Sequence, residues 1–228
     1  MRPDSRLTIL HFGNDWFAEN RTSSHQIARC MARKGFQVYY TECPGLRAPK
    51  GSGRDLKKIW SKLSKFLRGP RTVEGGVKVC TLLQVPLHRF SIVRRFNRAL
   101  MVWTLRWRLW RDGIRNPVTW FMVPHLASVV GKLGEQLSVY YCIDDYAAMP
   151  DVNAKAIRYM DEELTRKADF VFVASDTLLE CKLRLNPNSH VSPHGVDFHH
   201  FTRAQEADLD VPADVATLPR PVIGFFGP

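Results

Sequence analysis

The sequence predicts an α/β fold, with a doubly wound, mainly parallel sheet and helices on both faces. Apolar runs of strand length alternate with stretches whose apolar residues recur at helical spacing, and this alternation is typical of strand–helix–strand units. With 228 residues, of which 45% are hydrophobic, the chain is long enough to bury one sizeable core. The expected strands lie near 7–12, 36–42, 77–85, 118–123, 138–143, 170–175, 190–193 and 222–226.

The first strand–helix–strand unit shows the pattern most clearly. Between its two strands, residues 23–34 place apolar and small side chains on one helical face, and Gly35 provides the turn that ends the helix. Two further helices are expected over 154–168 and 176–185, and Asp176 is placed to cap the second of them. Such helices supply the crossover connections that a parallel sheet requires.

The charge balance points to anionic partners. The chain has 33 Lys and Arg residues against 22 Asp and Glu, a formal net charge of +11, which suits phosphates, nucleic acid or acidic lipid surfaces. Because the sequence has no RNP, KH or helix-turn-helix pattern, we expect no nucleic-acid partner. The five cysteines are scattered and never form a CxxC pair, which predicts neither a metal site nor a disulfide framework.

The loop after the first strand is the first candidate site. Gly13, Asn14 and Asp15 follow the strand and precede a helix, and in doubly wound sheets the loops at the carboxyl ends of the strands form the ligand crevice. We therefore predict that these three residues bind substrate. The alternative is that His11 and Asp15 serve only turn formation and helix capping. Since Gly13 is the one glycine available here, the GxGxxG pattern of nicotinamide enzymes is absent from this loop.

A histidine follows the strand expected at 118–123. His125 lies at the carboxyl end of a central strand, where an imidazole can donate to a sugar hydroxyl or to an oxyanion. We therefore predict a catalytic role for His125. The alternative is a histidine at the start of a helix with no chemical role.

The strongest internal motif is Tyr-Tyr-Cys-Ile-Asp-Asp-Tyr at 140–146, a buried strand that ends in paired carboxylates and an aromatic ring. Carboxylates bind sugar hydroxyls and act as bases, and aromatic faces bind the CH groups of sugar rings. We predict that Asp145 is catalytic and that Asp144 and Tyr146 bind substrate. The alternative is that one of the carboxylates only caps the following segment.

The last part of the chain carries the signals of a domain junction. Pro-His-Gly-Val-Asp at 193–197 precedes a polar stretch, and a buried strand ending in a glycine turn, as at 221–228, is how an α/β domain begins. We therefore expect one domain over 1–201, a linker over 202–220 and the first strand of a truncated second domain over 221–228. His194 is predicted to bind substrate beside the crevice.

This order of segments resembles the junction between the two halves of GT-B glycosyltransferases of the large family-four group, which use nucleotide-sugar donors. The resemblance rests on 140–146, on the run 163–175 and on the Pro-His-Gly-Val-Asp segment, where His194 replaces the more usual Asn. It covers residues 115–228 well and 7–42 moderately, and it does not extend to 43–110. The motif at 140–146 is similar to that of the enzymes that build bacterial teichuronic acid and related surface polymers.

The resemblance implies an N-terminal, acceptor-side, Rossmann-like domain. The whole enzyme would be a retaining hexosyltransferase that moves a hexosyl group from a nucleotide sugar to a cell-surface polysaccharide or a lipid-linked acceptor, without a bound metal or other cofactor. His125 would lie close to the donor sugar. The chain alone would be inactive, because the family draws much of its stabilisation of the leaving phosphate from the second domain.

A basic aromatic helix is expected over 91–114. At helical spacing, one face carries Trp103, Trp107 and Trp110 and is predicted to be core, while the opposite face mixes arginines with Leu and Met and is predicted to be exposed. Basic residues beside exposed apolar ones are typical of a membrane-surface element, and the basic series in 57–71 adds a second patch. The alternative is an arginine-rich solvated helix.

These patches predict peripheral contact with the inner face of the cell membrane. The N-terminus has neither a long apolar segment nor a cleavage site, so we expect no signal peptide, no membrane-spanning helix and a cytoplasmic location. A rival function from another class is a non-catalytic Rossmann module that binds sugars or an anionic surface.

Overall fold

The structure is a computed structural model that describes residues 7–18, 21–43, 69–82, 91–150, 152–206 and 210–225. The chain divides into two compact units, Met1–His194 and Gly195–Pro228. Residues 57–68 of the predicted basic series lie outside the described part of the chain. The first unit contains the sheet and the helices that cover it.

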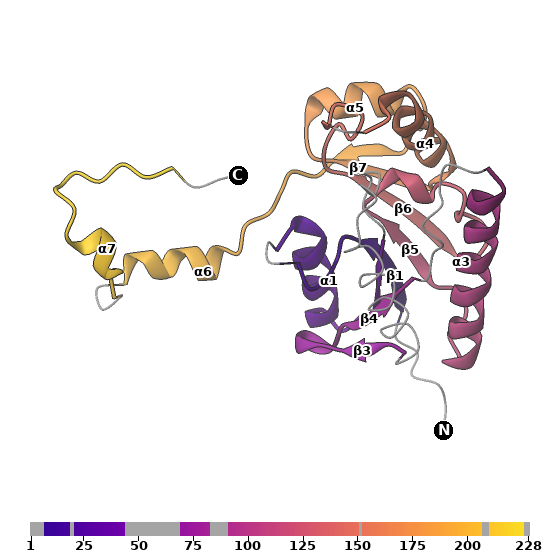
Figure 1. Cartoon of the computed structure of the whole chain (residues 1–228), viewed down its shortest axis with the longest axis horizontal. Helices are drawn as coiled ribbons and strands as arrows, with labels where there is room; N and C mark the ends of the chain where they lie inside the picture. The colour runs from indigo at the N-terminus through magenta and orange to yellow at the C-terminus, as the bar shows by residue number, and fades with distance from the viewer. Residues whose placement is uncertain are drawn as a thin grey trace, which may run out of the picture. The chain divides into compact units, whose positions relative to one another are not determined.

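The sheet of the first unit has eight strands in the order β3-β4-β2-β1-β5-β6-β7-β8 (Figure 1). The strands are β1 (Thr8–Gly13), β2 (Gln37–Glu42), β3 (Arg71–Thr72), β4 (Lys78–Thr81), β5 (Val118–Phe121), β6 (Leu137–Cys142), β7 (Phe170–Val173) and β8 (Ser189–Val191). All pairings are parallel except that of β3 with β4. The chain runs outward from β1 through β2 to β4 and returns to β5 beside β1, so the switch point of the sheet lies between β1 and β5.

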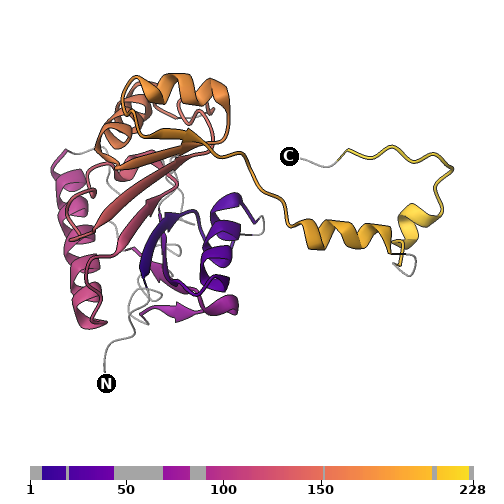
Figure 2. The same ribbon diagram turned by 180° about the vertical axis from the view of Figure 1, so that it is seen from behind.

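Helices cover both faces of the sheet, and Figures 1 and 2 show α1 and α3 on opposite sides of it. The helices are α1 (Ser23–Arg33), α3 (Ser91–Arg111), α4 (Ala154–Lys167) and α5 (Asp176–Leu183), with single 3-10 turns at η1 (Glu74–Gly76) and η2 (Pro124–Leu126). α1 packs Ala28 into a cluster with Trp16 and Tyr40. α3, α4 and α5 pack on the other face around Phe121 and Tyr140. The predicted fold class, a doubly wound and mainly parallel α/β sheet, is confirmed.

The ends of two helices show how the local sequence sets the boundaries. Gly35 has a φ of 92°, in the left-handed region that glycine favours, and the Phe36 N–H donates to Met31 O at 3.2 Å, which ends α1 as predicted. The predicted cap of α5 is wrong by one residue. Ser175 Oγ, rather than Asp176, accepts the N–H of Leu178 at 3.4 Å.

The strands expected between residues 7 and 193 all form, most of them shorter than predicted. Of the strand expected near 222–226, the described residues 222–225 have no regular secondary structure, and residue 226 lies outside the described part of the chain. A strand requires a pairing partner, which the described part of the second unit lacks. The described helices of that unit are α6 (Phe198–Thr202), η3 (Arg203–Gln205) and α7 (Ala213–Ala216). β3 was not predicted, since a strand of two residues has no readable period.

The prediction for the two faces of α3 is wrong. Met101, Leu105 and Leu109 are buried in the main core, whereas Trp103 and Trp110 are 65% and 78% exposed. Both stripes of this helix are apolar at helical spacing, so periodicity alone could not choose between them. The slimmer aliphatic stripe packs on the sheet with Phe12 and Phe121, and the bulky indoles face outward.

Candidate functional site

All the predicted site residues lie at the edge of the sheet where the parallel strands end. Residues 13–15 lie at or after the end of β1, His125 follows β5, residues 144–146 follow β6, and His194 follows β8. Ser23 Oγ and His194 Nδ1 are 3.0 Å apart, so a hydrogen bond joins the first turn of α1 to the end of β8. Since the first N–H groups of a helix favour anions, the edge beside Ser23 and His194 suits an anionic or polyhydroxylated ligand.

Gly13 has a packing role that only glycine can fill. A Cβ atom at this position would lie 2.7 Å from Tyr40 Cζ and would also overlap Ser24 Oγ and the Tyr40 hydroxyl. The missing side chain therefore lets the first turn of α1 and the second strand approach the end of β1 directly. Gly13 shapes the edge even where it does not itself contact a ligand.

A buried chain of hydrogen bonds lies behind Gly13. The Tyr40 hydroxyl donates to Asn14 O at 2.9 Å, which leaves the Ser24 hydroxyl to donate to Tyr40 at 2.9 Å. Ser24 Oγ must then accept the hydrogen of His11 Nε2, 3.0 Å away. Complete burial, with a smaller effect of the nearby His25, lowers the pKa of His11 to about 3. His11 is therefore a neutral imidazole, and the chain of hydrogen bonds that begins at it ends on Asn14 O and holds the first loop in place.

A histidine completes the N-terminal cap of α1. His25 Nδ1 accepts the backbone N–H of Thr22 at 3.0 Å, and His25 Nε2 donates to Asp15 O at 3.0 Å. His25 thus takes the place that Glu or Gln fills in a capping box and ties the helix to the loop after β1. Burial is the largest cause of the lowered pKa of His25. Sequence reasoning missed this role because histidine seldom fills the third position of the box.

Asp15 takes part in the turn of the first loop. Its Oδ1 accepts the N–H of Phe17 at 3.0 Å, and the side chain is exposed. This is the turn role that the sequence left open as an alternative. Contact of Asn14 and Asp15 with substrate stays a prediction.

Sequence reasoning missed Glu42, the buried carboxyl group of this edge. Glu42 ends β2, pairs in register with Gly13, and accepts the Trp16 N–H at 3.2 Å and the Thr81 hydroxyl at 2.6 Å. Burial raises the pKa of Glu42, and the negative charge of nearby Asp15 adds to this effect. The signal in the sequence was an acidic residue at the end of an apolar strand.

The residues that follow β5 and β6 form a second part of the edge. Tyr146 is buried, and its hydroxyl donates to Met122 O at 2.6 Å, which holds the loop after β6 against the end of β5. His125 is half-buried within η2, three residues beyond that anchor. The anchored loop therefore holds Asp145, which follows β6, beside the segment after β5 that carries His125.

The two exposed carboxylates of this loop also shape it. Asp144 Oδ1 accepts the Asp145 N–H at 2.8 Å, and Asp145 Oδ1 accepts the Ala147 N–H at 3.1 Å. Both side chains therefore act in the local turn, as the alternative reading allowed. A direct role of Asp144, Asp145 and Tyr146 in substrate binding or catalysis stays a prediction. In the described part of the chain, no group of three His, Cys, Asp or Glu side chains is placed to hold a metal ion.

Comparisons with known proteins bear on the fold. No protein-family model matches the chain, and no curated protein does. A solved structure described as trehalose-6-phosphate from E. coli bound with UDP-2-fluoro glucose matches with a TM-score of 0.51 at 12% sequence identity. The match covers 93% of this chain, and this chain spans about half, 53%, of that protein. At this identity the likeness shows the fold, and it agrees with the predicted half of a GT-B fold.

Proposed function

We propose that this chain is the acceptor-side half of a glycosyltransferase that uses a nucleotide sugar. The observation that carries the proposal is the structural match over 93% of the chain to a protein solved with a UDP-sugar. The polar groups at the carboxyl edge of the sheet support it, because that edge is where doubly wound folds bind their ligands. In this proposal the reaction transfers a hexosyl group, with retention, to a cell-surface polysaccharide or a lipid-linked acceptor.

The proposed roles follow from the two parts of the edge. In the part of the edge that follows β5 and β6, Asp145 accepts a hydroxyl of the sugar or acceptor, and His125 donates to a sugar hydroxyl or to developing negative charge. On the other part, Gly13, Ser23 and His194 receive polar groups of the substrate beside the start of α1. The bond from the anomeric carbon to the phosphate oxygen breaks, and the nucleotide leaves with that oxygen and the bonding electron pair. The acceptor oxygen forms the new bond to the anomeric carbon, and its proton passes to the departing phosphate. Contacts to the leaving phosphate come mainly from a second domain.

Hexose transfer by two forms of the protein tests this proposal. The 228-residue chain and a form extended by a second domain are incubated with labelled nucleotide sugars and with lipid-linked or polysaccharide acceptors. We expect transfer by the extended form only. In that form, His125→Ala and Asp145→Asn should lower kcat much more than they lower Tm, whereas Glu180→Gln at an exposed position within α5 should change neither. Turnover by the 228-residue chain, or unchanged kinetics in both edge variants, would contradict these roles.

A non-catalytic module that binds an anionic surface is the second candidate function. The observation that favours it is the groove lined by Arg95, Arg98, Arg106 and Lys132, described below. The hexose-transfer assay with the extended form distinguishes a glycosyltransferase from a binding module, because a binding module transfers no sugar even when a second domain is present. A cytoplasmic location at the inner face of the membrane is proposed for either function.

A further inference from the structure

The outward face of α3 carries a stripe of exposed aromatic side chains. Phe96, Trp103, Trp107 and Trp110 are 58%, 65%, 43% and 78% exposed. Their spacing of seven, four and three residues keeps them on one side of the helix, and at the rise of an α-helix the stripe extends about 21 Å. Single exposed apolar residues are ordinary, but a continuous row of large rings on one helix indicates a surface that is covered in use.

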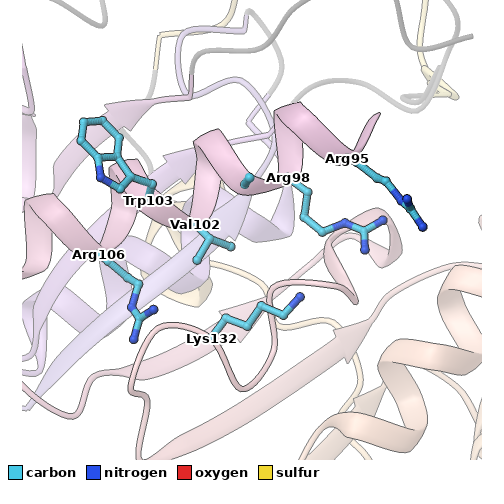
Figure 3. Close-up of a pocket in the computed structure, with 7 residues that line it drawn as sticks. Arg95, Arg98, Val102, Trp103, Arg106 and Lys132 are labelled. Carbon is cyan, nitrogen blue, oxygen red and sulfur yellow. The ribbon is translucent and has the colours of Figure 1, made fainter. Parts of the chain in front are cut away.

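A cationic groove runs beside this aromatic stripe. Arg95, Arg98, Arg106 and Lys132 line a shallow groove of about 470 Å³ together with Val102 and Trp103. Figure 3 shows Lys132 reaching from the loop before β6 toward the side of α3 that carries Arg98, Val102 and Arg106. Within the described part of the chain, none of the four cations forms an ion pair with a carboxylate. Four like charges around one groove favour an anionic partner.

We infer that this face of α3 docks the protein on the surface of a bilayer that contains anionic lipids. Indole rings favour the membrane interface because they combine an apolar body with a polar N–H, and neighbouring cations favour lipid phosphates. In this arrangement Trp103 lies at the boundary of the two features and brings ring and charge to the same lipid headgroups. None of the described helices is long and apolar enough to cross the bilayer, so the contact is with the surface.

The same observations disfavour other partners. A second copy bound through this face in a symmetric dimer would bring two unpaired cationic grooves together without carboxylates to offset them. A nucleic-acid duplex would satisfy the cations, but its phosphate backbone would leave the row of rings on α3 uncovered. A bilayer surface that is both apolar and anionic satisfies the stripe and the groove together. A single-stranded nucleic acid, whose bases stack on aromatic rings, is the rival occupant that the DNA comparison below tests. The inference goes beyond the proposed transfer reaction and does not depend on it.

Vesicle flotation and tryptophan fluorescence test the inference with the 228-residue chain. The vesicles contain phosphatidylcholine alone or phosphatidylcholine with about a third phosphatidylglycerol. We expect binding to the anionic vesicles only, with a blue shift of the tryptophan emission. A rise in salt should weaken the binding without abolishing it, because the charge contribution is screened and the apolar contribution is not.

Two variants separate the contributions of the groove and the stripe. Arg95→Gln/Arg98→Gln/Arg106→Gln should weaken vesicle binding about a hundredfold, at about fivefold for each charge removed. Trp103→Ser/Trp110→Ser should lose the salt-resistant part of the binding. The matched control is Arg158→Gln/Tyr159→Ser on α4, which removes an exposed cation and a 68% exposed ring from another groove and should bind like the wild type.

Several outcomes would overturn the inference. Equal binding of all variants, no binding to either vesicle, or an equal loss in the α4 control would each show that α3 is not the docking surface. Tighter binding to DNA than to anionic vesicles would assign the groove to nucleic acid. A dimer that dissociates in the tryptophan variant would assign the stripe to a second copy. Because the substituted side chains are exposed, unchanged circular dichroism and Tm are expected and confirm that each variant is folded.

Discussion

Acidification should destabilise this protein through His11, the buried imidazole behind the first loop. Its pKa is about 3 in the folded chain, against 6.5 for an ordinary histidine. Because the folded value is the lower one, the stabilising contribution is complete above 6.5 and is lost as the pH falls toward 3. Between pH 7 and pH 5 the unfolded chain gains a proton at this site that the folded chain does not bind. The free energy of unfolding should therefore fall by about 2 kcal/mol from this group alone.

Urea unfolding near pH 7 and near pH 5 measures this contribution. His11→Gln keeps an N–H donor for Ser24 but cannot titrate, so the variant should lose about 2 kcal/mol less than the wild type on acidification. It should also be less stable than the wild type near pH 7, since the stacking of His11 on Tyr40 is lost. Leu105→Ala, which destabilises the core but removes no titratable group, is the control, and its dependence on pH should parallel the wild type. If His11→Gln also parallels the wild type, the reasoning about the buried imidazole is wrong.

Two further changes test the packing. Gly13→Ala should lower the free energy of unfolding by about 1–3 kcal/mol, because the added carbon overlaps Ser24 and Tyr40, and a thermal melt that matches the wild type would refute this. Leu105→Ala should lower the free energy of unfolding by about 2–5 kcal/mol, since that side chain is in the core. Trp110→Ala, at an exposed position, should keep the free energy of unfolding within about 0.5 kcal/mol of the wild-type value. The reverse pattern in urea unfolding would show that α3 faces the other way.

Much of the fold could be predicted from the sequence because its strands are short apolar runs between helical patterns. β1 and α1 were the clearest, since a glycine ends each of them. The orientation of α3 could not be predicted, because Leu105 and Trp103 belong to two stripes that have the same period. The choice between those stripes depends on the shape of the sheet surface around Phe121, which no local pattern contains.

The sequence predicted where the candidate site lies, at the carboxyl ends of the strands, but not which residues contact one another there. The sequence placed Asp145, His125 and His194 after strands, and parallel strands bring their carboxyl ends to one edge. The hydrogen bond of His194 with Ser23 could not be predicted, since 171 residues separate the two. Glu42 was missed because a single acidic residue at a strand end has no motif.

The central claim is that the carboxyl edge of the sheet binds the substrates of sugar transfer. Amide NMR spectra of the 228-residue chain, titrated with nucleotide sugars and with candidate acceptor glycans, test it most directly. We predict shifts concentrated at Gly13, Ser23, His125, Asp145 and His194, and none with the matching free nucleoside. Shifts confined to α3 or α4, or no shifts with any donor or acceptor, would contradict the claim.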